Sequence, residues 1–245
     1  MKRIMKTMKI KFVLTLTILF IGGLILNVNA QNWRNTKKDI EKAVDVDTLT
    51  KKGYTLVWIN KEASFNPELK QELIETFFKT YPKLAKTFNK KTRKEVVFVI
   101  DPDYDGVAAT AGGIVRYSPK WFAKNPKDID VVTHEVMHIV QAYEGKSGPW
   151  WVTEGIADWV RFKYGVANEA GGWKLPAFDA KHSYENGYRI TARFFEWVEK
   201  KVKKNTMKKL DYVMRNHTYS SDFWKEQTGK TIDELWADYK LNPAI

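Results

Sequence analysis

A short pattern of two histidines and one glutamate constrains this chain more than any other feature of its sequence. His134, Glu135 and His138 stand in the segment His-Glu-Val-Met-His. On an α-helix, residues four positions apart lie one turn apart on the same face, so both imidazoles can reach one metal ion. Glu135 lies about 100° around the helix, where its carboxylate can address a metal-bound water. The pattern predicts a helix with a zinc site on one face.

The opposite face of this predicted helix is apolar, as a helix with a buried side requires. The apolar positions recur at helical spacing: Ile129, Val132, Val136, Ile139 and Tyr143. The alternative interpretation, two surface histidines beside a solvated glutamate, does not explain this apolar face. We therefore predict that one face serves the core and the other a site.

A zinc site that keeps a position for water needs a third protein ligand. No third histidine follows at the spacing of the longer zinc motifs, so we predict Glu154, sixteen positions after His138. Glu154 would lie on the first turn of the next helix, with Asp158 one turn further along the same face. Asp158 could accept a hydrogen bond from the far nitrogen of a zinc-bound histidine. The alternative for Asp158 is a buried carboxylate that serves helix packing.

Strands are predicted in the first half of the chain, where β-branched and aromatic residues gather. The clearest are residues 54–60 and the nearly unbroken apolar run at 95–100, and a shorter strand is expected at 113–118. Residues 67–88 have helical spacing, and we expect Pro82 to kink or split that helix.

The second half is predicted to be helical, whereas the polar residues 31–50 predict a loop or a short helix. Asn125 and Pro126 are typical of a helix start, and that helix is expected to run to about Glu144 and stop at Gly145. Further helices are predicted at 150–164, 184–203, 207–215 and 232–241. A strand-rich half followed by a helical half indicates an α+β fold.

The first 30 residues have the pattern of a secretory signal peptide. Residues 1–11 are basic, residues 12–28 are apolar and uncharged, and Val28-Asn29-Ala30 is a small-residue cleavage site. We predict cleavage after Ala30, a single domain over 31–245, no stable membrane insertion, and a secreted or periplasmic location. The alternative is an uncleaved anchor, for which 17 apolar residues are short.

Composition and charge limit how the protein can be stabilised and what it can bind. The chain has no cysteine, so packing rather than disulfides must stabilise it. Without residues 1–30 the formal charge falls from +12 to +7, because that segment holds five basic and no acidic residues. This balance could favour acidic surfaces or substrates. No basic stripe with interleaved aromatic residues stands out, so nucleic acid binding is not predicted.

One further segment mimics a metal site. Residues 101–106, Asp-Pro-Asp-Tyr-Asp-Gly, have the start of a calcium-binding loop. Such a loop carries glutamate at its twelfth position, where this chain has Gly112. We therefore predict a structural loop.

Several segments resemble the basic secretory protein family of plants and its bacterial relatives. They are HEVMHIVQ, WVTEGIADWVRFKYG, YENGYRITARFFEWVE and LWADYK, and the resemblance runs from about Tyr54 to Tyr239. That family is assigned to the gluzincin type of zinc peptidases. The resemblance implies a small twisted sheet with helices, an active-site helix with the His-Glu-x-x-His motif, a helical half, and a cleft between the two halves.

The resemblance also implies roles for residues outside the motif. Related peptidases place a tyrosine or histidine at the start of the corresponding helix, which makes Tyr188 the expected donor to the oxyanion, with Tyr184 and His182 as alternatives. Residues 113–117 would form the sheet edge, where an extended peptide could add as a strand. The expected substrate-binding residues are Gly113, Ile114 and Val115.

The predicted function is zinc-dependent hydrolysis of a peptide or protein substrate, with Glu135 as the general base. One alternative is a zinc-containing binding module without turnover that attaches to cell-wall or surface polymers. Glu135 argues against it, because zinc binding alone does not need that residue. A second alternative is a zinc hydrolase that acts on bonds other than peptide bonds.

Overall fold

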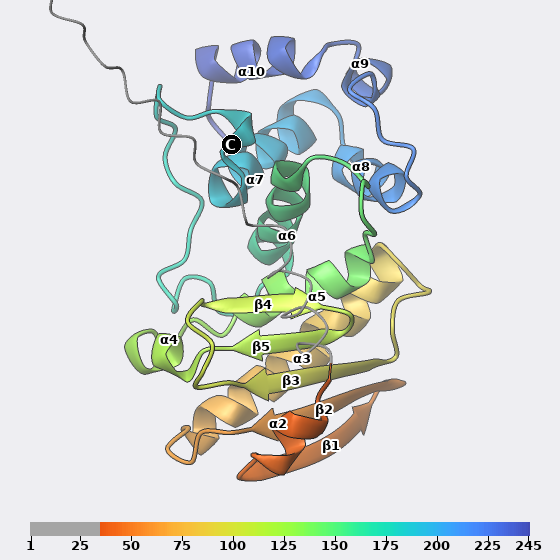
Figure 1. The fold of residues 1–245 in the computed structure, drawn as a ribbon. Coiled ribbons are helices and arrows are strands. Elements are labelled where there is room, and N and C mark those ends of the chain that lie inside the picture. The colour runs from red at the N-terminus through yellow and green to blue at the C-terminus, as the bar shows by residue number, and fades with distance from the viewer. Residues whose placement is uncertain (1–34) are drawn as a thin grey trace, which may run out of the picture. The chain divides into compact units, whose positions relative to one another are not determined.

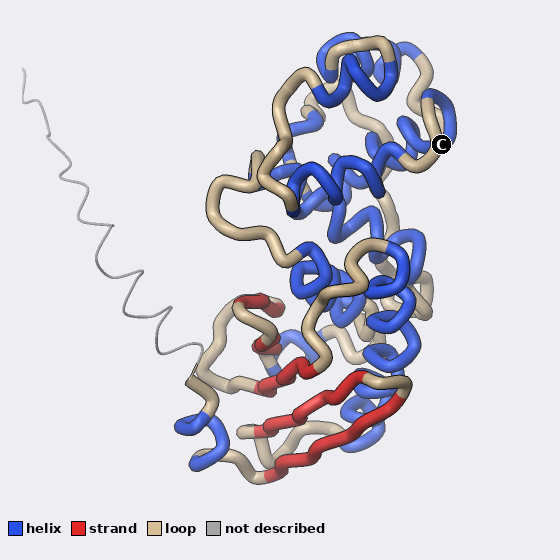
Figure 2. Tube along the Cα trace, turned by 90° about the vertical axis from the view of Figure 1, so that its right-hand side faces the viewer, coloured by secondary structure: helices blue, strands red, loops and turns tan. Residues whose placement is uncertain are grey.

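A five-stranded sheet organises the first half of the described chain, and helices form the second half (Figures 1 and 2). The computed structural model describes residues 35–245, so the predicted signal segment and its cleavage site lie outside the described residues. The predicted succession of a strand-rich half and a helical half is confirmed. Within the described residues, no helix has the length and apolar character needed to span a membrane.

The sheet is mixed. Its strand order is β1-β2-β3-β5-β4; β2, β3 and β5 run parallel, and β1 and β4 pair antiparallel with β2 and β5. A two-residue turn with φ of 55° at Lys52 and 75° at Gly53 joins β1 to β2. This conformation, positive at both positions, matches the twist of a hairpin and favours glycine. The strands are β1 (Asp45–Lys51), β2 (Tyr54–Asn60), β3 (Glu95–Ile100), β4 (Ala108–Ala111) and β5 (Ile114–Tyr117).

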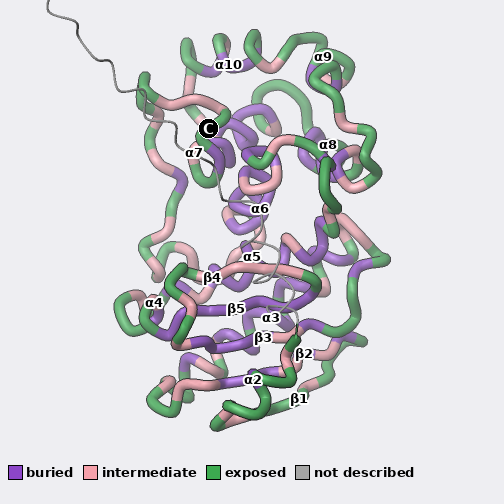
Figure 3. The backbone as a smooth tube through the Cα atoms, in the orientation of Figure 1, coloured by how far each residue is buried: buried purple, intermediate pink, exposed green. Residues whose placement is uncertain are grey.

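The predictions for β2 and β3 are confirmed, and two edge strands were not predicted. β1 lies where we expected a loop or a short helix; its residues are mostly exposed, so it lacks an apolar alternation (Figure 3). β4 consists of small, half-buried residues, Ala-Ala-Thr-Ala, which have little intrinsic strand preference. The prediction that residues 113–117 form the sheet edge is wrong. β5 lies between β3 and β4, so β4 is the edge.

Helix α3 (Pro67–Thr87) covers one face of the sheet, and Pro82 does not split it. Asn66 caps its start by accepting from the backbone N–H groups of Glu68 and Leu69. Pro82 has no N–H to donate to the Phe78 carbonyl one turn earlier. Lys52 Nζ donates to that carbonyl at 3.4 Å instead, and the helix continues past the proline.

The other face of the sheet carries α2 (Lys37–Glu41) and a buried ion network. Lys61 Nζ lies 3.0 Å from Asp39 and 2.6 Å from Asp101, while Arg116 pairs with the same two carboxylates at 2.6 and 2.9 Å. The network holds α2 on β5 and on the ends of β2 and β3. It also engages Asp101, the first residue of the segment that mimics a calcium loop.

The helix with the histidine pattern begins later than predicted. Asn125 ends α4 (Pro119–Lys124), its side chain donating to the Trp121 carbonyl, and the chain turns before α5 (Val131–Gln141) starts. Asp130 precedes α5 and accepts from the backbone of Val166 and Ala167. Ala142, with φ of 47°, ends α5 three residues before the predicted stop.

The remaining helices match the predicted segments except in two places. Gly187, with φ of 73°, separates the short 3-10 helix η1 from α7, so the predicted helix over 184–203 is broken. One short helix, α9, was not predicted. The elements are α6 (Trp150–Tyr164), η1 (Tyr184–Asn186), α7 (Tyr188–Trp197), η2 (Val198–Val202), α8 (Thr206–Arg215), α9 (Phe223–Thr228) and α10 (Ile232–Leu241).

Candidate metal centre

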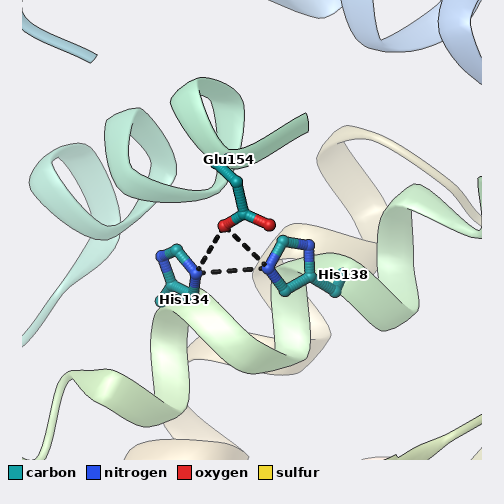
Figure 4. Close-up of side chains that lie close together, drawn as sticks. All are labelled: His134, His138 and Glu154. Atoms are coloured by element: carbon teal, nitrogen blue, oxygen red, sulfur yellow. Dashed lines mark hydrogen bonds and ion pairs between the residues drawn. The ribbon is translucent and has the colours of Figure 1, made fainter. Parts of the chain in front are cut away.

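Helices α5 and α6 bring His134, His138 and Glu154 together (Figure 4). Nε2 of His134 lies 3.1 Å from Nε2 of His138. Glu154 Oε2 lies 3.3 Å from the first nitrogen and 3.5 Å from the second. A tetrahedral zinc ion with ligands at about 2.0–2.1 Å sets those ligands about 3.3 Å apart. The spacing of the three atoms therefore fits one such ion.

The hydrogen bonds behind the two imidazoles also fit a metal. His134 Nδ1 lies 2.7 Å from Asp158 Oδ1, and His138 Nδ1 lies 2.7 Å from Gln141 Oε1. Both partners accept, so each Nδ1 carries its proton and each Nε2 presents a lone pair. Two lone pairs and a carboxylate oxygen then face one another. These acceptors repel unless a proton or a metal ion lies between them.

The electrostatics of this cluster favour positive charge. Burial lowers the pKa of His134, but the charge and hydrogen bond of Asp158, with the Glu154 carboxylate, outweigh it and raise the pKa to about 10. Burial raises the pKa of Glu154, but its contacts with His134 and His138 hold it well below the usual range. The site binds a proton tightly for the same reason that it can bind a divalent cation.

Glu135 lies beside this cluster without joining it. Its side chain is buried, and Oε2 accepts a hydrogen bond of 2.7 Å from the Thr110 hydroxyl. Thr110 belongs to the edge strand β4, so the sheet orients a carboxylate that the helix supplies. The site thus has three grouped ligand atoms and one separate, oriented carboxylate.

A cleft of about 1670 Å³ contains these groups. β4, α5, α6 and the start of α7 line its centre. Trp121, Asp128 and Trp173 line it near the start of α5, and Lys91 and Arg93 line it near the end of α5. Its volume exceeds the range of about 300–1,000 Å³ that is typical of small-molecule sites.

Tyr188 reaches the cleft because of the backbone around it. Gly187 and Tyr188 both have positive φ, 73° and 48°, and a side chain at Gly187 would collide with Trp150. Tyr188 is 51% exposed, and its ring stacks on His134 with centroids 6.2 Å apart. Burial, followed by the Glu154 and Asp158 charges, raises the pKa of Tyr188. A strained residue held at a site is typical of functional positions.

The two alternatives to Tyr188 lie elsewhere. The Tyr184 hydroxyl donates to Asp233 at 2.8 Å, and His182 Nδ1 accepts from the backbone N–H of Asp179. Neither belongs to the residues that line the cleft. Of the tyrosine and histidine candidates considered, the structure brings only Tyr188 to the ligand cluster.

The expected substrate-binding residues are only partly placed at the cleft. Gly113 lines it, but Ile114 and Val115 are buried in β5, behind β4. Thr110 and Gln141 contact the site and were not predicted. Gln141 follows His138 by three positions, a spacing that places two helical residues on one face, so a signal was present. Thr110 had none, because its contact depends on the strand order.

A model of the family described as peptidase of plants and bacteria matches residues 46–239. No curated protein matches the chain.

Among solved structures, a mutant of the M1 zinc metallopeptidase from Deinococcus radiodurans has a TM-score of 0.48 and 12% identity, over 83% of this chain and 52% of that one. The same enzyme with a Tyr-Ser-Ala substrate gives 0.49 and 14%, over 80% and 51%. Leukotriene A4 hydrolase from Saccharomyces cerevisiae gives 0.42 and 14%, over 81% and 36%. The chain spans about half the length of the Deinococcus enzyme.

Proposed function

Because the chain belongs to the family of peptidases of plants and bacteria, we propose that it is a zinc-dependent hydrolase that cleaves peptide bonds. His134, His138 and Glu154 would hold the metal, as the gluzincin type of site requires. The observation that carries the proposal is the contact of these three ligand atoms beside the separately oriented Glu135 carboxylate. A module that only binds zinc has no need for that carboxylate.

Zinc, when bound, polarises the scissile carbonyl and lowers the pKa of a water molecule beside it. Glu135 is the proposed general base: it takes a proton from the attacking water and delivers it to the leaving amine. The Thr110 hydroxyl donates to Oε2 of Glu135, and this hydrogen bond would orient the carboxylate for the transfer. Asp158 holds the Nδ1 proton of His134 and so keeps that ring oriented.

Tyr188 is the proposed donor to the oxyanion. Its ring lies against His134 and its side chain is half exposed to the cleft, so the hydroxyl can approach a bound carbonyl. Because burial and neighbouring carboxylates raise its pKa, the hydroxyl keeps its proton at neutral pH.

We also propose that an extended peptide adds to β4. The Ser118 N–H donates to the Val107 carbonyl, so these two residues form a hydrogen-bonded pair of the β4–β5 ladder. Such pairs alternate along an antiparallel ladder, so the backbone groups of Ala108 and Thr110 point away from β5. The Ala108 carbonyl accepts from Tyr104, which leaves the Thr110 backbone for substrate. Peptides with an N-methylated bond at the matching position should bind more weakly; equal binding would contradict this placement.

The location proposed for the enzyme is secreted or periplasmic. The support is the basic, apolar and small-residue pattern of residues 1–30. The exported protein should begin at Gln31 on N-terminal sequencing, and an intact N-terminus would contradict cleavage.

The decisive experiment combines cleavage profiling with one substitution. The purified protein, residues 31–245, is incubated with a proteome-derived peptide library with and without a chelator. Glu135→Gln and the control Glu41→Gln, on the distant α2, are treated in the same way.

We expect chelator-sensitive cuts from the native protein and the control. Glu135→Gln should lose about 10²–10⁴-fold in rate and keep one zinc per chain. Retained hydrolysis in Glu135→Gln would overturn the mechanism. A native protein that binds zinc but makes no cuts would favour a binding module.

A further inference from the structure

Gln141 is the last residue of α5, and its side chain is almost fully buried against the metal cluster. We propose that Gln141 is a positioning residue: it fixes the proton of His138 on Nδ1 and ties His138 to the helix turn that carries Glu154. The inference rests on the proposed zinc site, and it does not depend on which bond the enzyme cleaves.

The orientation of the Gln141 amide follows from its two contacts. Its Nε2 lies 2.9 Å from the Thr153 carbonyl oxygen, and its Oε1 lies 2.7 Å from His138 Nδ1. A backbone carbonyl can only accept, so the amide nitrogen must face Thr153. The amide oxygen then faces His138, and an oxygen of this kind can only accept as well. His138 Nδ1 must therefore donate.

This hydrogen bond decides which nitrogen of His138 is available to a metal. A neutral imidazole carries one proton, and a proton held at Nδ1 leaves the lone pair on Nε2. Nε2 is the atom that faces His134 Nε2 and Glu154 Oε2. Without Gln141, the proton could occupy Nε2 and block the ligand atom.

The same amide also spans the two helices of the site. Thr153 immediately precedes Glu154, so the bond to the Thr153 carbonyl anchors the peptide unit that leads into Glu154. α5 ends at Gln141, and Ala142 turns the chain in a left-handed conformation, so the side chain of Gln141 links the last turn of α5 to α6. Gln141 therefore contacts one ligand directly and the backbone of a second.

The two histidines have chemically different supports. His134 is held by Asp158, a carboxylate that can only accept, whereas His138 is held by a neutral amide that accepts and donates. A carboxylate at position 141 could still accept from His138 but could not donate to Thr153. This difference separates the two roles of Gln141 by substitution.

The test measures zinc affinity by competition with a chelating dye, for Gln141→Leu, Gln141→Glu and the control Gln71→Leu on α3. Leucine removes both hydrogen bonds, and we expect zinc affinity to fall about 10–100-fold. Glutamate restores the acceptor for His138, so most of the affinity should return. The control should bind as the native protein does. The Nδ1–H proton of His138, followed by NMR in the zinc-loaded protein, should be protected in the native protein and in Gln141→Glu and exchange rapidly in Gln141→Leu.

Native zinc affinity in Gln141→Leu would overturn the proposal. If Gln141→Leu does not fold, as judged by circular dichroism, Gln141→Glu tests the acceptor role alone: retained affinity together with a protected His138 Nδ1–H supports that role, and rapid exchange of this proton overturns it. Failure of the proposed peptidase function would look different, because it would leave this pattern of zinc affinities unchanged while no peptide is cut.

Discussion

Thr110 reaches the site from the sheet, and its hydroxyl donates to one oxygen of Glu135. Replacing it with valine keeps the shape and strand preference of the residue but removes the donor. A hydrogen bond to a charged group contributes about 1.5–3 kcal/mol, so kcat should fall about 10–100-fold in Thr110→Val. Zinc content should not change. Thr110→Ser retains the hydroxyl and should recover most of the rate.

Steady-state kinetics on one peptide, with zinc measured by atomic absorption, checks this expectation. An unchanged kcat in Thr110→Val would show that Glu135 needs no support from the sheet. A parallel loss of zinc would instead indicate damage to the ligand cluster.

The residues that sequence reasoning placed together are those related by helical spacing. His134, Glu135 and His138 lie within one helix, and Asp158 follows Glu154 by one turn, so local geometry was enough to group them. The approach of Glu154 to the histidines needed the packing of α6 on α5, which spacing suggests but does not determine. Thr110 depends on β4 lying beside α5, a long-range contact with no local pattern.

At the scale of elements, α3 has an unusual solution to an internal proline. Lys52 donates to the Phe78 carbonyl that Pro82 leaves without its helical partner, across 3.4 Å. Because the helix is already continuous, Pro82→Ala restores the missing N–H at its proper place. A proline inside a helix costs about 3 kcal/mol of stability. Part of this cost is offset, because proline stiffens the unfolded chain, which contributes about 0.4–1 kcal/mol, and because its ring packs against neighbours that alanine would not reach.

We therefore expect Pro82→Ala to unfold at a higher urea concentration, with a gain of about 1–2 kcal/mol. The slope of the unfolding transition should not change. A less stable Pro82→Ala would mean that α3 and its neighbours have adapted to the proline so closely that an alanine helix no longer fits.

The elements that could be predicted are those with a buried face. β2 and β3 alternate or run apolar because both lie inside the sheet, and their predicted bounds are confirmed. β1 is mostly exposed and β4 is half-buried, so neither strand has a fully buried face that requires an apolar pattern. The start of α5 was placed too early because Asn125 and Pro126 have the residues of a helix start but follow α4 closely.

At the scale of the whole molecule, Asp211 couples distant helices. It is fully buried on α8, accepts from the Tyr143 hydroxyl beyond α5, and pairs with Arg215. Burial raises its pKa from 3.8 to about 6, although Arg215 and Tyr143 act in the opposite direction. The folded state therefore binds this proton more tightly than the unfolded state does.

The sign of the pH dependence follows from this difference. As pH rises from about 4 to about 6, the unfolded chain loses the proton first, so this group lowers the free energy of unfolding by about 3 kcal/mol across the window. Asp211→Asn should remove this fall in the free energy of unfolding. Urea unfolding at pH 4.5 and at pH 7 measures the difference, with the exposed Asp222→Asn as control. An equal pH dependence in the native protein and Asp211→Asn would contradict the prediction.

The three ligands have a consequence that concerns chain entropy. His134, His138 and Glu154 come from consecutive helices, so a bound ion closes a loop of only about sixteen residues, and such a loop costs little to close. Thr110 and Tyr188, in contrast, come from segments on either side of this hairpin. The proposed ion site draws its ligands from one short stretch of chain, whereas the proposed catalysis also needs residues that are distant in sequence. A partly unfolded chain would then lose turnover while it still held its ion.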